Sequence, residues 1–184
     1  MKRQSRSFEI ALAALVCAVG AVSLTLGSFV DFLLAMGYMI AVFALMILLT
    51  KRLVRGYILA YVGMVILAFL FTGFAMGIFQ LLPFVAFFGL HPLANWLQRE
   101  YTKQKPLHLL WFVLKAVWFD LSLWLAWVVL QEFLGLAEMR WYAFVEDNFF
   151  LLLFVCGTLV FAVYDYMIFL CQRAADGVMR RLRK

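Results

Sequence analysis

The apolar residues of this chain fall into long blocks that are separated by short stretches carrying charges. A helix of about 20 residues is needed to cross the hydrocarbon core of a bilayer, which is about 30 Å thick. Six blocks approach or exceed that length: Phe8 to Leu26, Phe32 to Thr50, Gly56 to Thr72, Phe74 to Leu93, Leu107 to Leu130 and Phe149 to Cys171. The pattern predicts six transmembrane helices.

Composition excludes an ordinary soluble domain. Of the 184 residues, 67% are hydrophobic and only 14% are charged, with a mean hydropathy of +1.00, whereas about 25% of a soluble protein is charged. Runs such as Ala35 to Leu49 do not alternate between apolar and polar residues, as the strands of a membrane β-barrel would. We therefore expect an all-α integral membrane protein, a compact bundle of six helices that forms one domain over residues 1–184.

The distribution of cationic residues predicts the orientation, because short loops rich in Lys and Arg stay on the cytoplasmic side. With the N-terminus inside, 14 of the 16 Lys and Arg residues fall in the cytoplasm, and only Lys115 and Arg140 do not. Both termini are then cytoplasmic, and the plasma membrane is the expected location. The net charge of +6 is explained by this topology. Basic tails next to anionic lipid suffice, and no nucleic-acid partner is expected.

Glycine and proline mark the expected interruptions. We expect a turn at Gly27 and Ser28, a kink at Pro83, and a helix break between Gly89 and Pro92. His91 would then lie at the cytoplasmic interface, where a solvated or capping role is the simplest interpretation. Residues from Gln131 to Asn148 are expected to form an outer loop.

Three ionisable residues lie inside the predicted spans: Lys115, Asp120 and Asp165. Charges inside a membrane are costly and usually face protein or a water-filled cavity. With a rise of 1.5 Å per residue, Lys115 lies roughly 12 Å into the fifth span and Asp165 roughly 9 Å into the sixth, both from the cytoplasmic side. Their similar depth favours a buried ion pair. Snorkelling of Lys115 and a proton or ion pathway are the alternatives.

Asp120 lies near mid-membrane, on the same helix face as Trp124 and Trp127. A carboxylate with two indoles above it forms a plausible wall for a small solute entering from outside. The alternative is structural: the tryptophans form an aromatic belt, and Asp120 belongs to a buried hydrogen-bond network.

Further candidate solute-binding residues lie toward the outer side. They are Asp31, Gln80, Glu138, Arg140 and Trp141. Together they would surround the mouth of a pocket, with the outer loop as its lid. The alternative is an interfacial segment anchored by Trp141 and Tyr142.

The first helix carries a stripe of small residues, Ala11, Ala14, Ala18 and Ala21. Faces of this kind let another helix approach closely. Two roles are open for the stripe, internal packing and docking of a partner subunit.

Motifs for catalysis are absent from the sequence: there is no HExxH, P-loop, GxSxG or Cys/His cluster. No enzymatic activity, cofactor or metal site is expected. The three cysteines, Cys17, Cys156 and Cys171, lie in apolar blocks and are interpreted as small hydrophobic residues.

With its six short-looped helices and the segment Ala14 to Ala18, the chain resembles the substrate-binding S components of energy-coupling factor transporters. The resemblance implies capture of a vitamin or other micronutrient from outside. It also implies docking, through an alanine face of the first helix, onto a transmembrane coupling subunit driven by ATPase subunits. An alternative is a small membrane scaffold, similar in build to the rod-shape-determining six-helix proteins, that recruits partners and binds no solute.

Overall fold

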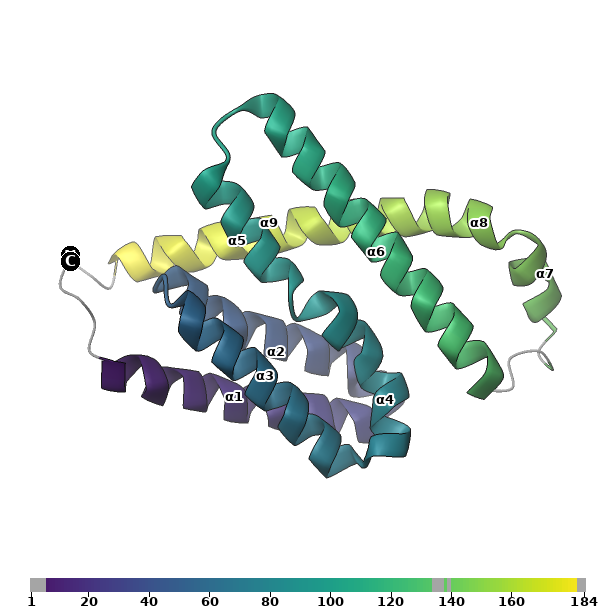
Figure 1. Ribbon diagram of the computed structural model, residues 1–184, viewed down its shortest axis with the longest axis horizontal. Helices are drawn as coiled ribbons and strands as arrows, with labels where there is room; N and C mark the ends of the chain where they lie inside the picture. Colours follow the sequence, from purple (N-terminus) through teal and green to yellow (C-terminus); the bar gives the residue numbers. More distant parts are fainter. Residues whose placement is uncertain (1–5, 134–137, 139, 182–184) are drawn as a thin grey trace. The chain divides into compact units, whose positions relative to one another are not determined.

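The structure is a computed structural model that describes residues 6–133, 138 and 140–181 (Figure 1). These residues are almost entirely helical and include no β-strand. Six segments are long and apolar enough to cross a membrane: Arg6–Phe29, Phe32–Thr50, Val54–Thr72, Gly77–Tyr101, Lys105–Val129 and Phe149–Gly177. The prediction of an all-α, six-span membrane protein is confirmed.

The chain separates into two compact units, which are described here one at a time. The first comprises Met1–Trp96 and Leu170–Lys184, and the second comprises Leu97–Phe169, as far as these ranges are described. The first unit contains helices α1 (Arg6–Phe29), α2 (Asp31–Thr50), α3 (Val54–Thr72) and α4 (Phe74–Pro83), the π-helix η1 (Phe84–Phe88) and the start of α5 (His91–Tyr101).

The second unit begins in α5 and ends in α9. Between these two lie α6 (Lys105–Phe133), α7 (Tyr142–Asp147), α8 (Phe149–Leu151) and the π-helix η3 (Leu152–Gly157), which leads into α9 (Thr158–Arg181). The last part of α9 belongs to the first unit.

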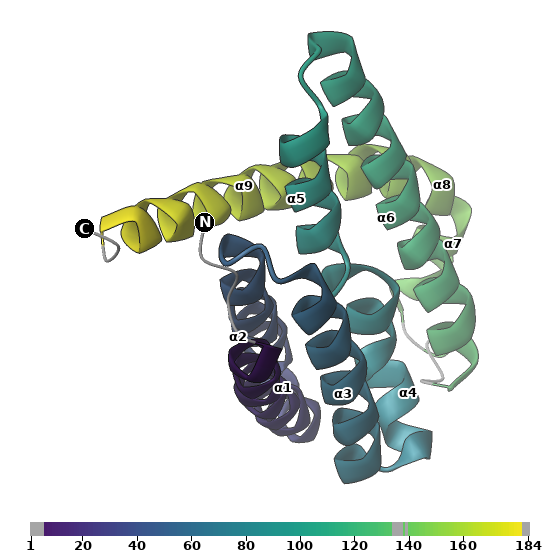
Figure 2. The ribbon, with the colours of Figure 1, turned by 60° about the vertical axis from the view of Figure 1, so that its left-hand side comes forward.

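Helix α1 packs along both α2 and α3, and the three lie side by side in Figures 1 and 2. Small residues allow this close approach. A Cβ atom added to Gly37 on α2 would lie 2.5 Å from the backbone oxygen of Ser23 on α1, and one added to Gly63 on α3 would lie 2.8 Å from the Cys17 sulfur. The inner face of α1 therefore depends on glycine for its contacts.

The turn expected at Gly27 and Ser28 is wrong. Both residues are buried in the last turns of α1, and the chain reverses at Val30 instead. A Cβ atom on Gly27 would lie 3.1 Å from the Leu33 oxygen and from the Leu34 Cα atom. Gly27 thus serves close packing against the start of α2 and does not mark a bend.

The fourth span is interrupted and then resumes. After Pro83, which has no backbone N–H, the helix widens into η1, breaks at Gly89 and Leu90, and continues as α5 from His91. The break was expected between Gly89 and Pro92, but the end of the span at Leu93 is wrong, because helix continues to Tyr101.

Three tyrosines donate hydrogen bonds to backbone carbonyls around this interruption. The Tyr57 hydroxyl donates to the Gly89 oxygen over 2.5 Å, the Tyr61 hydroxyl to the Val85 oxygen over 2.8 Å, and the Tyr38 hydroxyl to the Gln80 oxygen. A carbonyl without a partner is costly inside a membrane, and irregular helix is tolerated where neighbours satisfy it. Tyrosines from α2 and α3 therefore stabilise the interrupted span.

His91 is buried, so the expected solvated role is wrong. Its ring packs on Phe87, with centroids 4.9 Å apart and an interplanar angle of 35°. Because α5 resumes at His91, helical spacing places His91, Asn95 and Gln98 on one face, and all three are buried. The polar face of α5 is thus an interior face.

Candidate functional site

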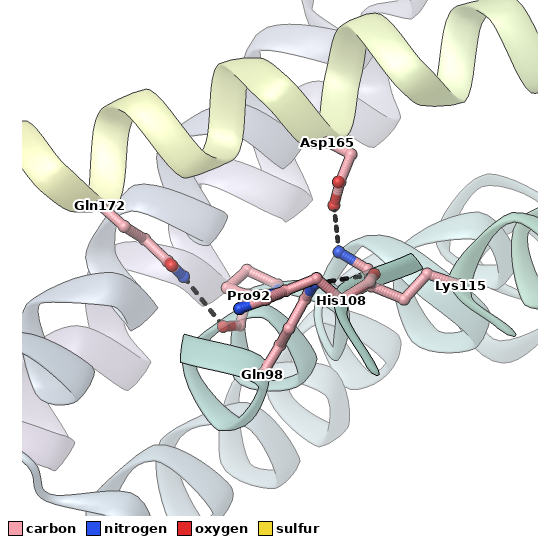
Figure 3. Close-up of polar contacts among 6 residues, drawn as sticks. All are labelled: Pro92, Gln98, His108, Lys115, Asp165 and Gln172. Atoms are coloured by element: carbon pink, nitrogen blue, oxygen red, sulfur yellow. Dashed lines mark hydrogen bonds and ion pairs between the residues drawn. The ribbon is translucent and has the colours of Figure 1, made fainter. Parts of the chain in front are cut away.

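The second unit joins α6 and α9 through a buried ion pair. The Lys115 Nζ atom lies 2.5 Å from Asp165 Oδ1, and the two side chains point toward each other in Figure 3. Lys115 is only 2% exposed and Asp165 13%. The structure thus brings together the two residues whose similar depth suggested a pair. Mutual contact lowers the cost of burying each charge.

Asp120 lies on α6, one and a half turns beyond Lys115, and is 7% exposed. Its Oδ2 atom accepts a hydrogen bond of 3.3 Å from the Thr158 hydroxyl at the start of α9. Its Oδ1 atom accepts none from any residue that the structure describes. A Cβ atom added to Gly157, the last residue of η3, would lie 3.2 Å from Oδ1. The absence of a side chain at Gly157 therefore lets the backbone of η3 lie close to the carboxyl oxygen that lacks a partner.

Asp120, Trp124 and Trp127, the predicted wall of a solute site, differ in exposure along α6, and solute binding by them stays a prediction. Trp124 is 42% exposed, while Asp120 is buried. Trp127 is stacked between two rings, at centroid distances of 5.8 Å from Tyr142 and 5.4 Å from Phe149. The two indoles therefore have different surroundings, and Trp127 belongs to an aromatic cluster that connects α6 to α7 and α8.

Outer candidate residues of the second unit are exposed: Glu138, Arg140 and Trp141. Beside them, the Tyr142 hydroxyl lies 3.2 Å from Gln131 Oε1 and 3.4 Å from Glu146 Oε1. Lost hydration and the Glu146 carboxylate raise the pKa of Tyr142 above its ordinary value. Tyr142 therefore connects the described part of the outer segment to Gln131 on α6.

The outer candidates of the first unit are Asp31 and Gln80. Asp31 begins α2, and its side chain lies outside the described part of the structure. Gln80 lies on α4, half-buried, and its backbone oxygen accepts the hydrogen bond from Tyr38. Their predicted convergence on a common site therefore stays a prediction.

The alanine stripe of α1 is divided. Ala21 is buried, but Ala11, Ala14 and Ala18 are exposed. The residues that pack against α2 and α3 lie on the opposite side of the helix, among them Ala13, Val16, Gly20 and Leu24. Internal packing therefore accounts for Ala21 alone, and the other three alanines form a small-residue face, Ala11/Ala14/Ala18, that no described residue covers.

Sequence reasoning missed two further polar contacts. In the second unit, Gln98 Nε2 lies 3.2 Å from His108 Nδ1 and 3.3 Å from the His108 backbone oxygen (Figure 3). In the first unit, the buried Gln172 side chain donates a 2.9 Å hydrogen bond to the Pro92 oxygen. A proline carbonyl next to a helix break is a signal for such an acceptor, but only the fold shows that Gln172 reaches it.

Comparison with known proteins adds no relative: the chain matches no family model, and no curated protein or solved structure is significantly similar to it. Function therefore has to be argued from the residues of this chain.

Proposed function

We propose that this chain is a substrate-capture subunit of a micronutrient uptake transporter in the plasma membrane. In this proposal the Ala11/Ala14/Ala18 face of α1 docks on a transmembrane coupling subunit, which ATPase subunits drive. The single observation that carries it is the exposure of these three alanines on a helix whose other side is packed against α2 and α3.

The physical reason is that apolar surface facing lipid gains nothing by burial against another helix unless the two backbones approach closely. A row of alanines permits that approach, whereas a lipid-facing surface has no need of small residues. The face therefore supports a partner helix of similar small-residue character. Solute capture is supported by the resemblance to S components and by the polar residues of the outer side.

A second candidate is the membrane scaffold, which uses the same face and binds no solute. The observation that favours it is the burial of Asp120, which is 7% exposed and accepts a hydrogen bond from Thr158, as a structural carboxyl group would.

Docking is tested by purifying the chain from its native membrane as Ala14→Trp and Ala18→Trp variants and identifying co-purifying subunits by mass spectrometry. Both variants should lose the partner while keeping the wild-type melting temperature in detergent. Val19→Trp is the matched control, because Val19 is also exposed and at the same depth, but it lies about 100° around the helix from Ala18. It should keep the partner.

Solute capture is tested separately, by screening vitamins and metal ions for thermal stabilisation of the wild-type chain. Retention of partners by both alanine variants, together with no stabilising solute, would end the transporter assignment. Loss of partners without any stabilising solute would favour the scaffold.

Orientation is part of the proposal and has its own test. Cysteines placed at Arg52 and Lys103 should react only from the cytoplasmic side, and one at Arg140 only from outside, because the loops rich in cationic residues stay inside. A single reversed loop would contradict the assigned topology.

A further inference from the structure

Among the residues that the structure describes in the second unit, Asp120 is a buried acid with one carboxyl oxygen that lacks a hydrogen-bond partner. The Asp120 residue is only 7% exposed, and it lies within the fifth span. One hydroxyl, that of Thr158, donates to Oδ2, and no described residue donates to Oδ1. A buried carboxylate normally has an opposite charge or several donors, because burying an uncompensated charge is very costly.

The other acid at the α6 and α9 junction has such compensation. Asp165 accepts from Lys115 at 2.5 Å, which commits that ammonium group to a different carboxylate. Asp120 therefore differs from Asp165 in having no described cation as partner.

Ionisable groups on the elements that pack against Asp120 do not replace that cation. On η3, Cys156 is exposed. On α9, Tyr164 and Asp165 follow Thr158 by six and seven residues, roughly 9 to 10 Å along the helix axis, and neither is cationic. On α6 itself, the nearest cation is Lys115. The remaining way to lower the cost of burial is to remove the charge.

We propose that Asp120 and Thr158 form an intramembrane proton-binding site, in which the Asp120 carboxyl reversibly takes up one proton on Oδ1 while the Thr158 hydroxyl donates to Oδ2. The ligand is a proton because the site offers too few oxygens for a metal. A hard cation such as Ca²⁺ requires six to eight oxygen ligands, and among the described residues no group of three or more His, Cys, Asp or Glu is placed to hold a metal ion.

Gly157 and η3 fit this role. With no side chain, Gly157 lets the backbone of η3 lie close to Oδ1, because an added Cβ atom would lie 3.2 Å from that oxygen. η3 ends at Gly157, directly before Thr158, and π-helical turns inside α-helices are frequent at functional sites. The Asp120/Thr158 site shares no residue with the Ala11/Ala14/Ala18 face of α1. The test of proton binding is therefore independent of the test of partner docking.

The test is infrared spectroscopy of the full-length chain in lipid, because the C=O stretch of a carboxylic acid is separate from the bands of a carboxylate. The wild type should show a carboxylic-acid band that disappears reversibly as pH is raised, and Asp120→Asn should lack that band. Thr158→Val removes a donor that favours the ionised form, so the band should persist to higher pH than in the wild type.

A chemical label provides an independent measurement. Dicyclohexylcarbodiimide, an apolar reagent that adds to protonated carboxyl groups in membranes, should label Asp120 in the wild type, and labelling should fall as pH rises. Asp165, paired with Lys115, should stay unlabelled. Gly157→Ala places a methyl group beside Oδ1 and should slow labelling several-fold, with the melting temperature showing that the variant is folded.

Three results would overturn the proposal. They are a carboxylic-acid band that is unchanged in Asp120→Asn, a band that does not titrate at any pH at which the chain stays folded, and equal labelling of Asp165. The Thr158→Val shift separates a working site from a neutral acid with a purely structural role, because only a titrating Asp120 can change its midpoint.

Discussion

Two of the six spans are interrupted by a π-helix, and the side chains around the two interruptions make different polar contacts. Around η1 in the first unit, tyrosines from neighbouring helices donate to the backbone oxygens of Gln80, Val85 and Gly89. At the end of η3 in the second unit, the neighbour is the carboxyl group of Asp120, and it brings one unpartnered oxygen to Gly157.

The difference indicates which interruption is structural and which is a candidate for function. The η1 region is filled by aromatic side chains, with Phe84 and Phe87 buried and Tyr38 close to the Phe84 ring. Its polar contacts are neutral side chains that donate to backbone. The η3 region instead lies at a junction where charges are buried, between α6 and α9. The unpartnered Oδ1 atom of Asp120 is the reason why we propose a functional role for η3 and not for η1.

Loss of the buried cation should have the largest effect. Lys115→Met leaves Asp165 buried without its partner, and removal of one member of a buried pair costs about 3 to 5 kcal/mol. The free energy of unfolding in mixed micelles should fall by that amount. It is expected to recover in part in Lys115→Met combined with Asp165→Leu, because no uncompensated charge remains. A double variant no more stable than the worse single variant would contradict the pairing.

Alanine at the glycine of each interruption should come next and compares the two directly. A Cβ atom on Gly89 would lie 2.5 Å from a ring atom of Tyr61 and 2.9 Å from one of Phe84, and the Tyr61 ring is held by its bond to Val85. Overpacking of this kind costs about 1 to 3 kcal/mol. Gly157→Ala, with its nearest contact at 3.2 Å, should cost clearly less. Equal losses in thermal unfolding would contradict the view that η1 is the tightly packed interruption.

Removal of a tyrosine hydroxyl should have a smaller effect. Tyr57→Phe leaves the Gly89 oxygen without its donor at a buried site, and hydrogen bonds between membrane helices contribute about 0.6 to 1.7 kcal/mol. We expect a loss of about 1 kcal/mol. Tyr166→Phe is the control, because Tyr166 is 64% exposed, and it should not change the melting temperature. If both variants behave alike, the tyrosines do not stabilise the interrupted span.

The spans themselves were predictable, because an apolar block long enough to cross the bilayer core indicates a transmembrane helix without any knowledge of tertiary contacts. The juxtaposition of Lys115 and Asp165 followed from depth alone, since sequential helices place residues of equal depth near one another. The tyrosine contacts did not follow. Which carbonyl Tyr57 reaches depends on the rotation of α3 about its axis, and blocks that are apolar on every side carry no information on rotation.

Helix rotation also explains what the sequence left open at Asp120 and why the expectation for His91 was wrong. Spacing places Asp120 and Trp124 on neighbouring positions of one face, but only the fold shows that Asp120 is buried and that Trp124 is 42% exposed. For His91, proximity to Pro92 suggested the end of a helix. The decisive feature is instead the resumption of helix after Gly89, which turns a polar face of α5 inward. Hydropathy predicts the reverse, since it assigns polar residues to water.

The smallest expected effect separates the two tryptophans of α6. Trp127 is stacked with Tyr142 and Phe149, and aromatic pairs contribute about 0.5 to 1.5 kcal/mol beyond the area they bury. Trp127→Leu should therefore lower the free energy of unfolding by about 1 kcal/mol. Trp124 is exposed and within the fifth span, so Trp124→Leu exchanges one lipid-facing apolar side chain for another and should change stability by less than about 0.5 kcal/mol.

The same two variants test the wall that the sequence suggested. If Asp120, Trp124 and Trp127 shared a solute site, Trp124→Leu would weaken stabilisation by that solute as strongly as Trp127→Leu. We expect the exposed Trp124 indole to face lipid, so a solute that contacts the Trp127 cluster should respond to Trp127→Leu and not to Trp124→Leu. Equal sensitivity of both positions, measured as the solute-induced shift in melting temperature, would favour a site that Trp124 and Trp127 share.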